Sequence, residues 1–180
     1  MKSKILILAL ILTSLFSCKV SNTSLVAINS SDLAGTWTIK NITMDDAVLN
    51  VTDPVNITLT GKGFGKNFNT NITFSENPNR VTMTGDFVFE LTYTEPSGVE
   101  KTESLIFDNI FFNDNFGFTT SSWALDDNTL QLNESGENLT INVISYVDNV
   151  LTIETDVNKS ITLDGVTSTV VGKATINIQK

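Results

Sequence analysis

The feature that most constrains the fold is a two-residue alternation that runs from residue 80 to residue 93. One parity is apolar: Val81, Met83, Phe87, Phe89, Leu91 and Tyr93. The other parity is mostly polar: Thr82, Thr84, Asp86, Glu90 and Thr92. Successive side chains of a β-strand point to opposite faces, so the pattern predicts a strand with one buried face.

The same alternation returns in shorter form along the rest of the chain, at 55–59, 72–74, 139–143, 151–153 and 174–178. Clusters of Asn, Asp, Ser, Gly and Pro separate these segments and are typical of tight turns. No window combines a 3.6-residue period with helix caps. We therefore expect an all-β domain of about eight to ten strands, either an up-and-down antiparallel β-barrel or a β-sandwich.

A short motif at the start of this region favours the barrel. Leu33, Gly35 and Trp37 stand in the order Leu-Ala-Gly-Thr-Trp. The motif resembles the opening of lipocalin-like (calycin) barrels, in the form found in bacterial lipocalin-like lipoproteins. The resemblance implies that the turn with Leu33 closes one end of the barrel and that Trp37 packs across its floor. Members of the family also place an arginine against this tryptophan, and Lys173 is the candidate for that place here.

The N-terminus predicts export and acylation. Lys2 and Lys4 precede an apolar block of about 12 residues, which is signal-peptide length and too short to span a bilayer. The block ends in Leu-Phe-Ser-Cys, which resembles the lipobox of bacterial lipoproteins. The resemblance implies a lipoprotein signal peptide at 1–17, a lipid anchor at Cys18 with a flexible tether to residue 31, and a lipocalin-like β-barrel domain at 32–180.

Location follows from the same segment. The expected site is the bacterial cell envelope, with the protein lipid-anchored in the outer membrane through acylated Cys18 and facing the periplasm, because no acidic run follows the cysteine. The alternative is an ordinary secretory signal in which Cys18 is incidental. A protein partner is not identifiable from the sequence.

Composition excludes several function classes. The net charge of −9 repels phosphate backbones, so we expect no nucleic acid as a partner. The chain has no histidine and a single cysteine, so the usual catalytic base and thiolate are absent. We expect no enzyme, no cofactor and no metal; turns at 113–117 and 126–128 carry oxygen ligands but lack the EF-hand spacing. Gly61, Gly63 and Gly65 fit no phosphate-loop spacing and are interpreted as bends in a strand.

Aromatic residues provide the best indication of a site. If the barrel closes, the apolar parity of the 80–93 strand lines its interior, which in eight strands holds packed side chains or one small ligand. The predicted ligand-binding residues are Met83, Phe87, Phe89, Leu91 and Tyr93. Two functions remain open: a module that binds or carries a small apolar ligand or lipid, and a structural or interaction module with a solid core that docks a protein or glycan.

Overall fold

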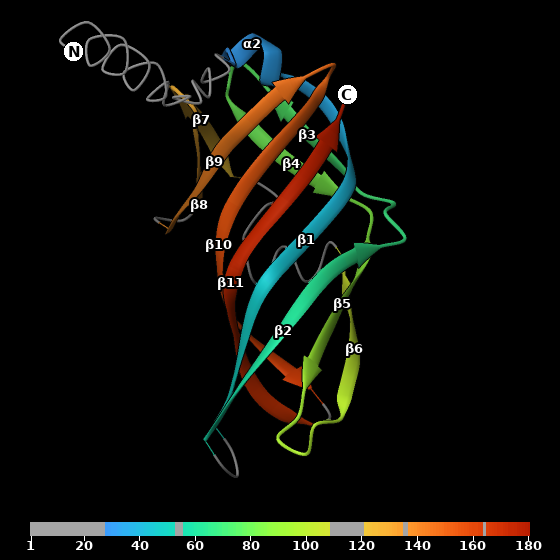
Figure 1. Cartoon of the computed structure of the whole chain (residues 1–180). Helices are drawn as coiled ribbons and strands as arrows, with labels where there is room; N and C mark the ends of the chain where they lie inside the picture. Colours follow the sequence, from blue (N-terminus) through green and yellow to red (C-terminus); the bar gives the residue numbers. More distant parts are fainter. Residues whose placement is uncertain (1–27, 53–55, 109–120, 135–136, 164) are drawn as a thin grey trace, which may run out of the picture.

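The computed structural model describes residues 28–52, 56–108, 121–134, 137–163 and 165–180. One short helix, α2 (Ser30–Leu33), precedes the strands (Figure 1). The strands are β1 (Gly35–Val51), β2 (Ile57–Lys66), β3 (Asn71–Ser75), β4 (Arg80–Thr84), β5 (Phe87–Thr94), β6 (Glu100–Phe107), β7 (Ser122–Asp126), β8 (Thr129–Glu134), β9 (Glu137–Val147), β10 (Val150–Leu163) and β11 (Val166–Gln179). The predicted signal peptide and Cys18 lie outside the described residues.

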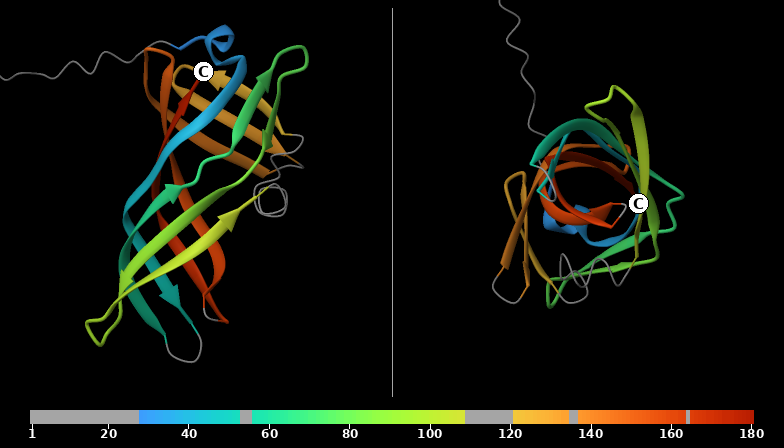
Figure 2. Two further views of the ribbon diagram at one scale, coloured as in Figure 1. Left: turned by 90° about the vertical axis from the view of Figure 1, so that its right-hand side faces the viewer. Right: turned by 90° about the horizontal axis from the view of Figure 1, so that it is seen from below.

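The described strands form an antiparallel up-and-down barrel, as the sequence predicts. Three pairs of segments, β2 with β3, β4 with β5 and β6 with β7, each continue along one line, so the eleven segments occupy eight lines. Each line pairs antiparallel with the next in chain order, and β11 returns to pair with β1. That last pairing closes the ring and rules out the sandwich; Figure 2 shows the strands around a central axis.

The first strand bends twice. Its register against β11 shifts between Ile39 and Asn41 and again between Thr43 and Val48. The buried positions change parity at each shift: they are Trp37 and Ile39, then Ile42 and Met44, then Ala47 and Leu49. A β-bulge adds one residue to one strand and increases its bend. These bulges let one 17-residue strand curve along the whole barrel with its apolar side inward.

Lines two and three break at one level. Gly85 separates β4 from β5 at φ +90, and a Cβ there would lie 1.7 Å from the Asn69 carbonyl oxygen. The Asp86 carbonyl accepts hydrogen bonds from Asn69 N at 2.9 Å and from Thr70 Oγ1 at 2.8 Å. Thr70 is fully buried. The two breaks are thus bonded to each other, and we call this pair of breaks the hinge.

The hinge divides the barrel into two halves. The closed half contains α2, the start of β1, β3, β4, β7, β8, β9, the first residues of β10 and the last of β11. The open half contains the end of β1, β2, β5, β6, residues 155–163 of β10 and the start of β11. In the open half the described strands leave the outer edges of β6 and β10 with no paired strand.

The closed half has one weak backbone junction. A single residue pair, Arg80 with Ser122, joins β4 to β7. Trp123 reinforces it: its Nε1 donates to the Ser75 carbonyl at 2.9 Å, and its ring meets the Phe74 ring edge-on with centroids 5.9 Å apart.

Within the described residues no helix has the length and apolarity needed to cross a bilayer.

Candidate ligand-binding site

An apolar cavity of about 170 Å³ lies inside the barrel, across the level of the hinge. Ile39, Phe74 and Leu130 line it from the closed half, and Phe87 and Val170 line it from the open half. These five residues are buried, whereas Leu105 and Phe107 on β6 line the cavity but are partly exposed. Among the described residues α2 lies at one end of the barrel, and no helix enters the barrel to fill this space.

Four of the five predicted ligand-binding residues line the cavity. Met83, Phe87, Phe89 and Leu91 are buried and stand on its wall. Tyr93 is buried too but does not line it; it lies beside a separate polar depression that includes Asp45 and Lys62. Tyr93 stands at the end of β5, next to the β5–β6 turn, and that position removes it from the cavity.

The glycines of β2 determine how the aromatic rings lie. A Cβ on Gly63 would lie 2.1 Å from the Phe89 ring, and a Cβ on Gly65 would lie 2.5 Å from the Phe68 ring. Both glycines are in a regular strand, so their role is to accept rings against the backbone rather than to bend the strand. Phe107 stacks on Phe87 with centroids 5.0 Å apart. Because Gly63 has no side chain, the Phe89 ring lies directly against the backbone of β2.

The end of the barrel near α2 is filled. The predicted floor residues Leu33, Gly35 and Trp37 lie together here, with Leu33 and Trp37 fully buried. Trp37 Nε1 donates to the Leu33 carbonyl at 2.7 Å. Ile28, in the segment predicted as tether, is also buried here.

The cation on Trp37 differs from the expectation. Lys180 Nζ lies 5.1 Å from the Trp37 ring centroid and donates to the Asp32 carbonyl at 2.6 Å. The expectation for Lys173 was wrong: it lies on the outer face, paired with Glu154 at 2.9 Å, and this hydrogen bond raises the pKa of the lysine. Register explains the difference, because Gln179 pairs with Thr38 and so brings the last residue beside the tryptophan.

The opposite end is filled as well. Leu49 and Leu59 flank the β1–β2 connection, and Leu163 precedes the β10–β11 turn. All three are at least nine-tenths buried, and none lines the cavity. The cavity is therefore covered along the barrel axis by side chains at both ends.

The side of the barrel is different. Three of the 26 lining residues are polar or charged, namely Thr155, Asp156 and Lys159, and all three are on β10. They lie in the stretch of β10 whose backbone pairs with β11 alone among the described strands, and Thr155 Oγ1 donates to the Thr140 carbonyl of β9 at 3.4 Å. Among the described residues, no strand lies between the edges of β6 and β10 on this side of the cavity. We call this gap the seam.

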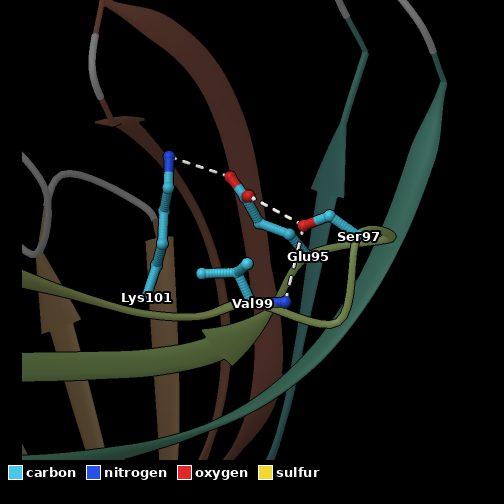
Figure 3. A network of polar contacts seen from close by, with 4 residues as sticks. All are labelled: Glu95, Ser97, Val99 and Lys101. Atoms are coloured by element: carbon cyan, nitrogen blue, oxygen red, sulfur yellow. Dashed lines mark hydrogen bonds and ion pairs between the residues drawn. The ribbon is translucent and has the colours of Figure 1, made fainter.

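A polar turn borders the seam on the β6 side (Figure 3). Lys101 Nζ lies 2.8 Å from Glu95 Oε1, and Ser97 Oγ donates to Glu95 Oε2 at 3.4 Å. The Val99 N–H donates to Ser97 Oγ at 3.4 Å. The hydrogen bond from Lys101 lowers the pKa of the Glu95 carboxyl. These contacts hold the β5–β6 turn at one side of the opening.

Several residues of the site have no signal in the sequence analysis. Thr155, Lys159 and Lys180 were not predicted, because an edge strand and a register are properties of the closed sheet. The turn at 113–117, which carries oxygen ligands, and the neighbouring residues Phe111, Phe112, Phe116 and Phe118 lie outside the described residues. Among the described residues, no group of three or more His, Cys, Asp or Glu side chains is arranged to hold a metal ion.

Comparison with known proteins adds no relative. A scan against protein-family models, a search of curated proteins and a search of solved structures each found no match. The lipocalin resemblance of Leu33, Gly35 and Trp37 therefore stays a prediction, while the closed eight-line barrel is a property of the structure.

Proposed function

We propose that this chain is a non-catalytic, lipid-anchored envelope protein whose barrel binds or carries a small apolar ligand. The cavity is the observation that supports the proposal. Its wall is apolar except at the seam, and such walls with a few polar groups at one side are typical of small-molecule sites. A solid core, on which the alternative docking function depends, fits this interior less well.

The cavity volume limits the ligand. Drug-sized molecules occupy sites of roughly 300–1,000 Å³. An engineered apolar cavity of about 150 Å³ holds benzene. A volume of about 170 Å³ therefore has room for a group of about six carbon atoms, with any remainder of the ligand in the seam.

Two methionines make the proposal testable in solution. The chain has three methionines, and Met44 and Met83 both line the cavity. In protein labelled with ¹³C at the methionine methyls, benzene should shift both signals saturably, with a dissociation constant of about millimolar or below. Signals that move only linearly with benzene concentration would contradict the proposal.

A cavity-filling variant locates the binding. Ala174 lines the cavity and is buried, so Ala174→Leu should fill part of it and weaken benzene binding at least tenfold, at a stability cost of about 1–3 kcal/mol. Ala124→Leu is the matched control, because Ala124 is exposed on β7. Equal binding by the two variants would place the benzene elsewhere.

The anchor needs its own test. Cys18→Ala should abolish incorporation of a labelled fatty acid and release the protein from the membrane fraction, because only a thiol at this position can form the thioether. Ser17→Ala, which keeps a small residue before the cysteine, is the control and should remain labelled. If Cys18→Ala still incorporates the labelled fatty acid, the protein is not anchored through Cys18, and that part of the proposal is wrong.

A further inference from the structure

We infer that the ligand of this barrel carries an aromatic ring, which lies against one side of the cavity wall while the aliphatic part of the ligand lies against the other side. The inference rests on the proposed function. It adds the chemical class of the ligand and its orientation in the cavity.

The rings and sulfur atoms of the cavity wall come from one side of the barrel. Six lining residues carry a phenyl ring or a thioether: Met44, Phe74, Met83, Phe87, Phe89 and Phe107. All six stand on β1, β3, β4, β5 or β6, which belong to one continuous stretch of the sheet from β4 to β6. We call this part of the wall the aromatic side.

The facing part of the wall is aliphatic. It is built by β8, β9, β10 and β11, which are also consecutive in the sheet, and the pairing of β11 with β1 joins it to the aromatic side. Its lining residues are Leu, Ile, Val and Ala, apart from Thr155, Asp156 and Lys159 on β10. We call this part the aliphatic side. A ligand that fills the cavity therefore contacts two surfaces of different chemistry.

The rings of the aromatic side hold one another in place. Phe107 stacks on Phe87 with centroids 5.0 Å apart, and it meets the Phe89 ring at 67° with centroids 5.8 Å apart. Phe89 in turn lies against the backbone of Gly63, where a Cβ would be 2.1 Å from its ring. A wall that is ordered before the ligand binds costs less to use, so these rings form a preorganised surface.

This surface should distinguish an aromatic ring from a saturated one. A phenyl ring has a negative face and a positive edge, so a ligand ring can pack edge-to-face or offset on the phenylalanines, and the methionine sulfurs add contacts at ring edges. A saturated ring of the same size lacks these contacts. They should favour benzene over cyclohexane by about two- to tenfold beyond hydrophobic transfer. An alkyl group gains nothing from the rings and should face the aliphatic side.

The first experiment compares benzene with cyclohexane. Both are titrated into the full chain carrying Cys18→Ser and ¹³C-labelled at its methionine and isoleucine methyls, with the Met44 and Met83 signals as readout. Each association constant is divided by the ligand's partition coefficient from water to hexadecane, because transfer alone favours the more hydrophobic cyclohexane. We expect the corrected affinity for benzene to be about two- to tenfold the higher. Equal corrected affinities would overturn the inference.

Variants of the wall test whether its rings cause the preference. Phe89→Leu and Phe107→Leu each remove one ring from the aromatic side, and each should lower the corrected preference for benzene at least twofold; circular dichroism checks that both fold. Leu132→Ile is the matched control, because Leu132 lines the aliphatic side and the substitution conserves volume. A preference that survives in both phenylalanine variants, or that falls equally in Leu132→Ile, would contradict the assignment of the ring to the aromatic side.

The second experiment tests the orientation with toluene, which adds one methyl carbon to benzene and stays close to the cavity volume. Nuclear Overhauser effects from its ring protons should be strongest at the Met44 and Met83 methyls. Those from its methyl protons should be strongest at the methyls of Ile141 and Ile153, which line the aliphatic side. A reversed or even distribution would overturn the orientation.

The outcomes separate the inference from the function on which it rests. If neither benzene nor cyclohexane shifts the methyl signals saturably, the proposed function fails and the inference fails with it. If both bind without preference or orientation, the function stands and the inference alone is wrong.

Discussion

The two halves of the barrel share β1, β10 and β11, yet among the described residues only one half closes. In the closed half every line reaches its neighbours, and Trp37 and Trp123 fill the end and the weak junction. In the open half β9 pairs with the 14-residue β10 only over Val150–Glu154, so the rest of β10 has no described strand paired on that side. Among the described strands, the barrel opens where β9 and β10 stop pairing, and the inward positions of β10 beyond that point include the polar residues Thr155 and Lys159.

The strongest test of the contrast truncates one side chain in each half. Trp37→Ala should lower the free energy of unfolding by about 3–5 kcal/mol, because it empties a fully buried site. Leu105→Ala, at a half-buried position on β6, should cost only about 1 kcal/mol. Urea unfolding monitored by circular dichroism measures both, and equal costs would show that the halves are equally packed.

The second-largest loss of stability is expected from a substitution at the hinge. Gly85→Ala adds a Cβ against the Asn69 backbone at positive φ, so we expect a loss of at least about 2 kcal/mol. Gly98→Ala is the control: its φ is +83 but its Cβ would meet open space, and about 1 kcal/mol is expected. Equal melting temperatures for the two variants would show that the close approach of Gly85 to the Asn69 backbone does not affect stability.

The smallest effect belongs to the turn beside the seam. Because the folded-state pKa of Glu95 is lowered from its ordinary value of 4.5, its ion pair with Lys101 stabilises the fold above that value and is lost as the pH falls through the folded-state pKa. The pair is exposed, so Glu95→Gln should leave the melting temperature at pH 7 unchanged within error. A clear drop at pH 7 that disappears at pH 3 would show that this turn supports the open half.

The strand pattern predicted the fold where side chains alternate without interruption. The apolar parity of residues 81–93 is buried throughout, even though Gly85 divides it into two strands. The length of β1 could not be predicted in the same way. Two polar doublets, at residues 40–41 and 45–46, reverse the parity, and only pairing with β11 shows that they are bulges within one strand.

The candidate site was predictable in part for the same reason. Met83, Phe87, Phe89 and Leu91 follow from parity, because an inward face needs only local geometry. Tyr93 has that parity but lies too far along β5, and no local pattern gives the height of a residue in a barrel. Lys180 and Lys159 carry no local signal, since their positions depend on partners far away in the chain.

By itself, the sequence determined that strands form, which side of each is apolar and where most turns fall, because these depend on neighbours within a few residues. Closure between β1 and β11, the hinge at Gly85, the seam beside β10 and the space left inside were decided only by the tertiary structure. The physical reason is that register, strand overlap and cavity volume arise from contacts between distant segments, and such contacts leave no periodic trace in the chain.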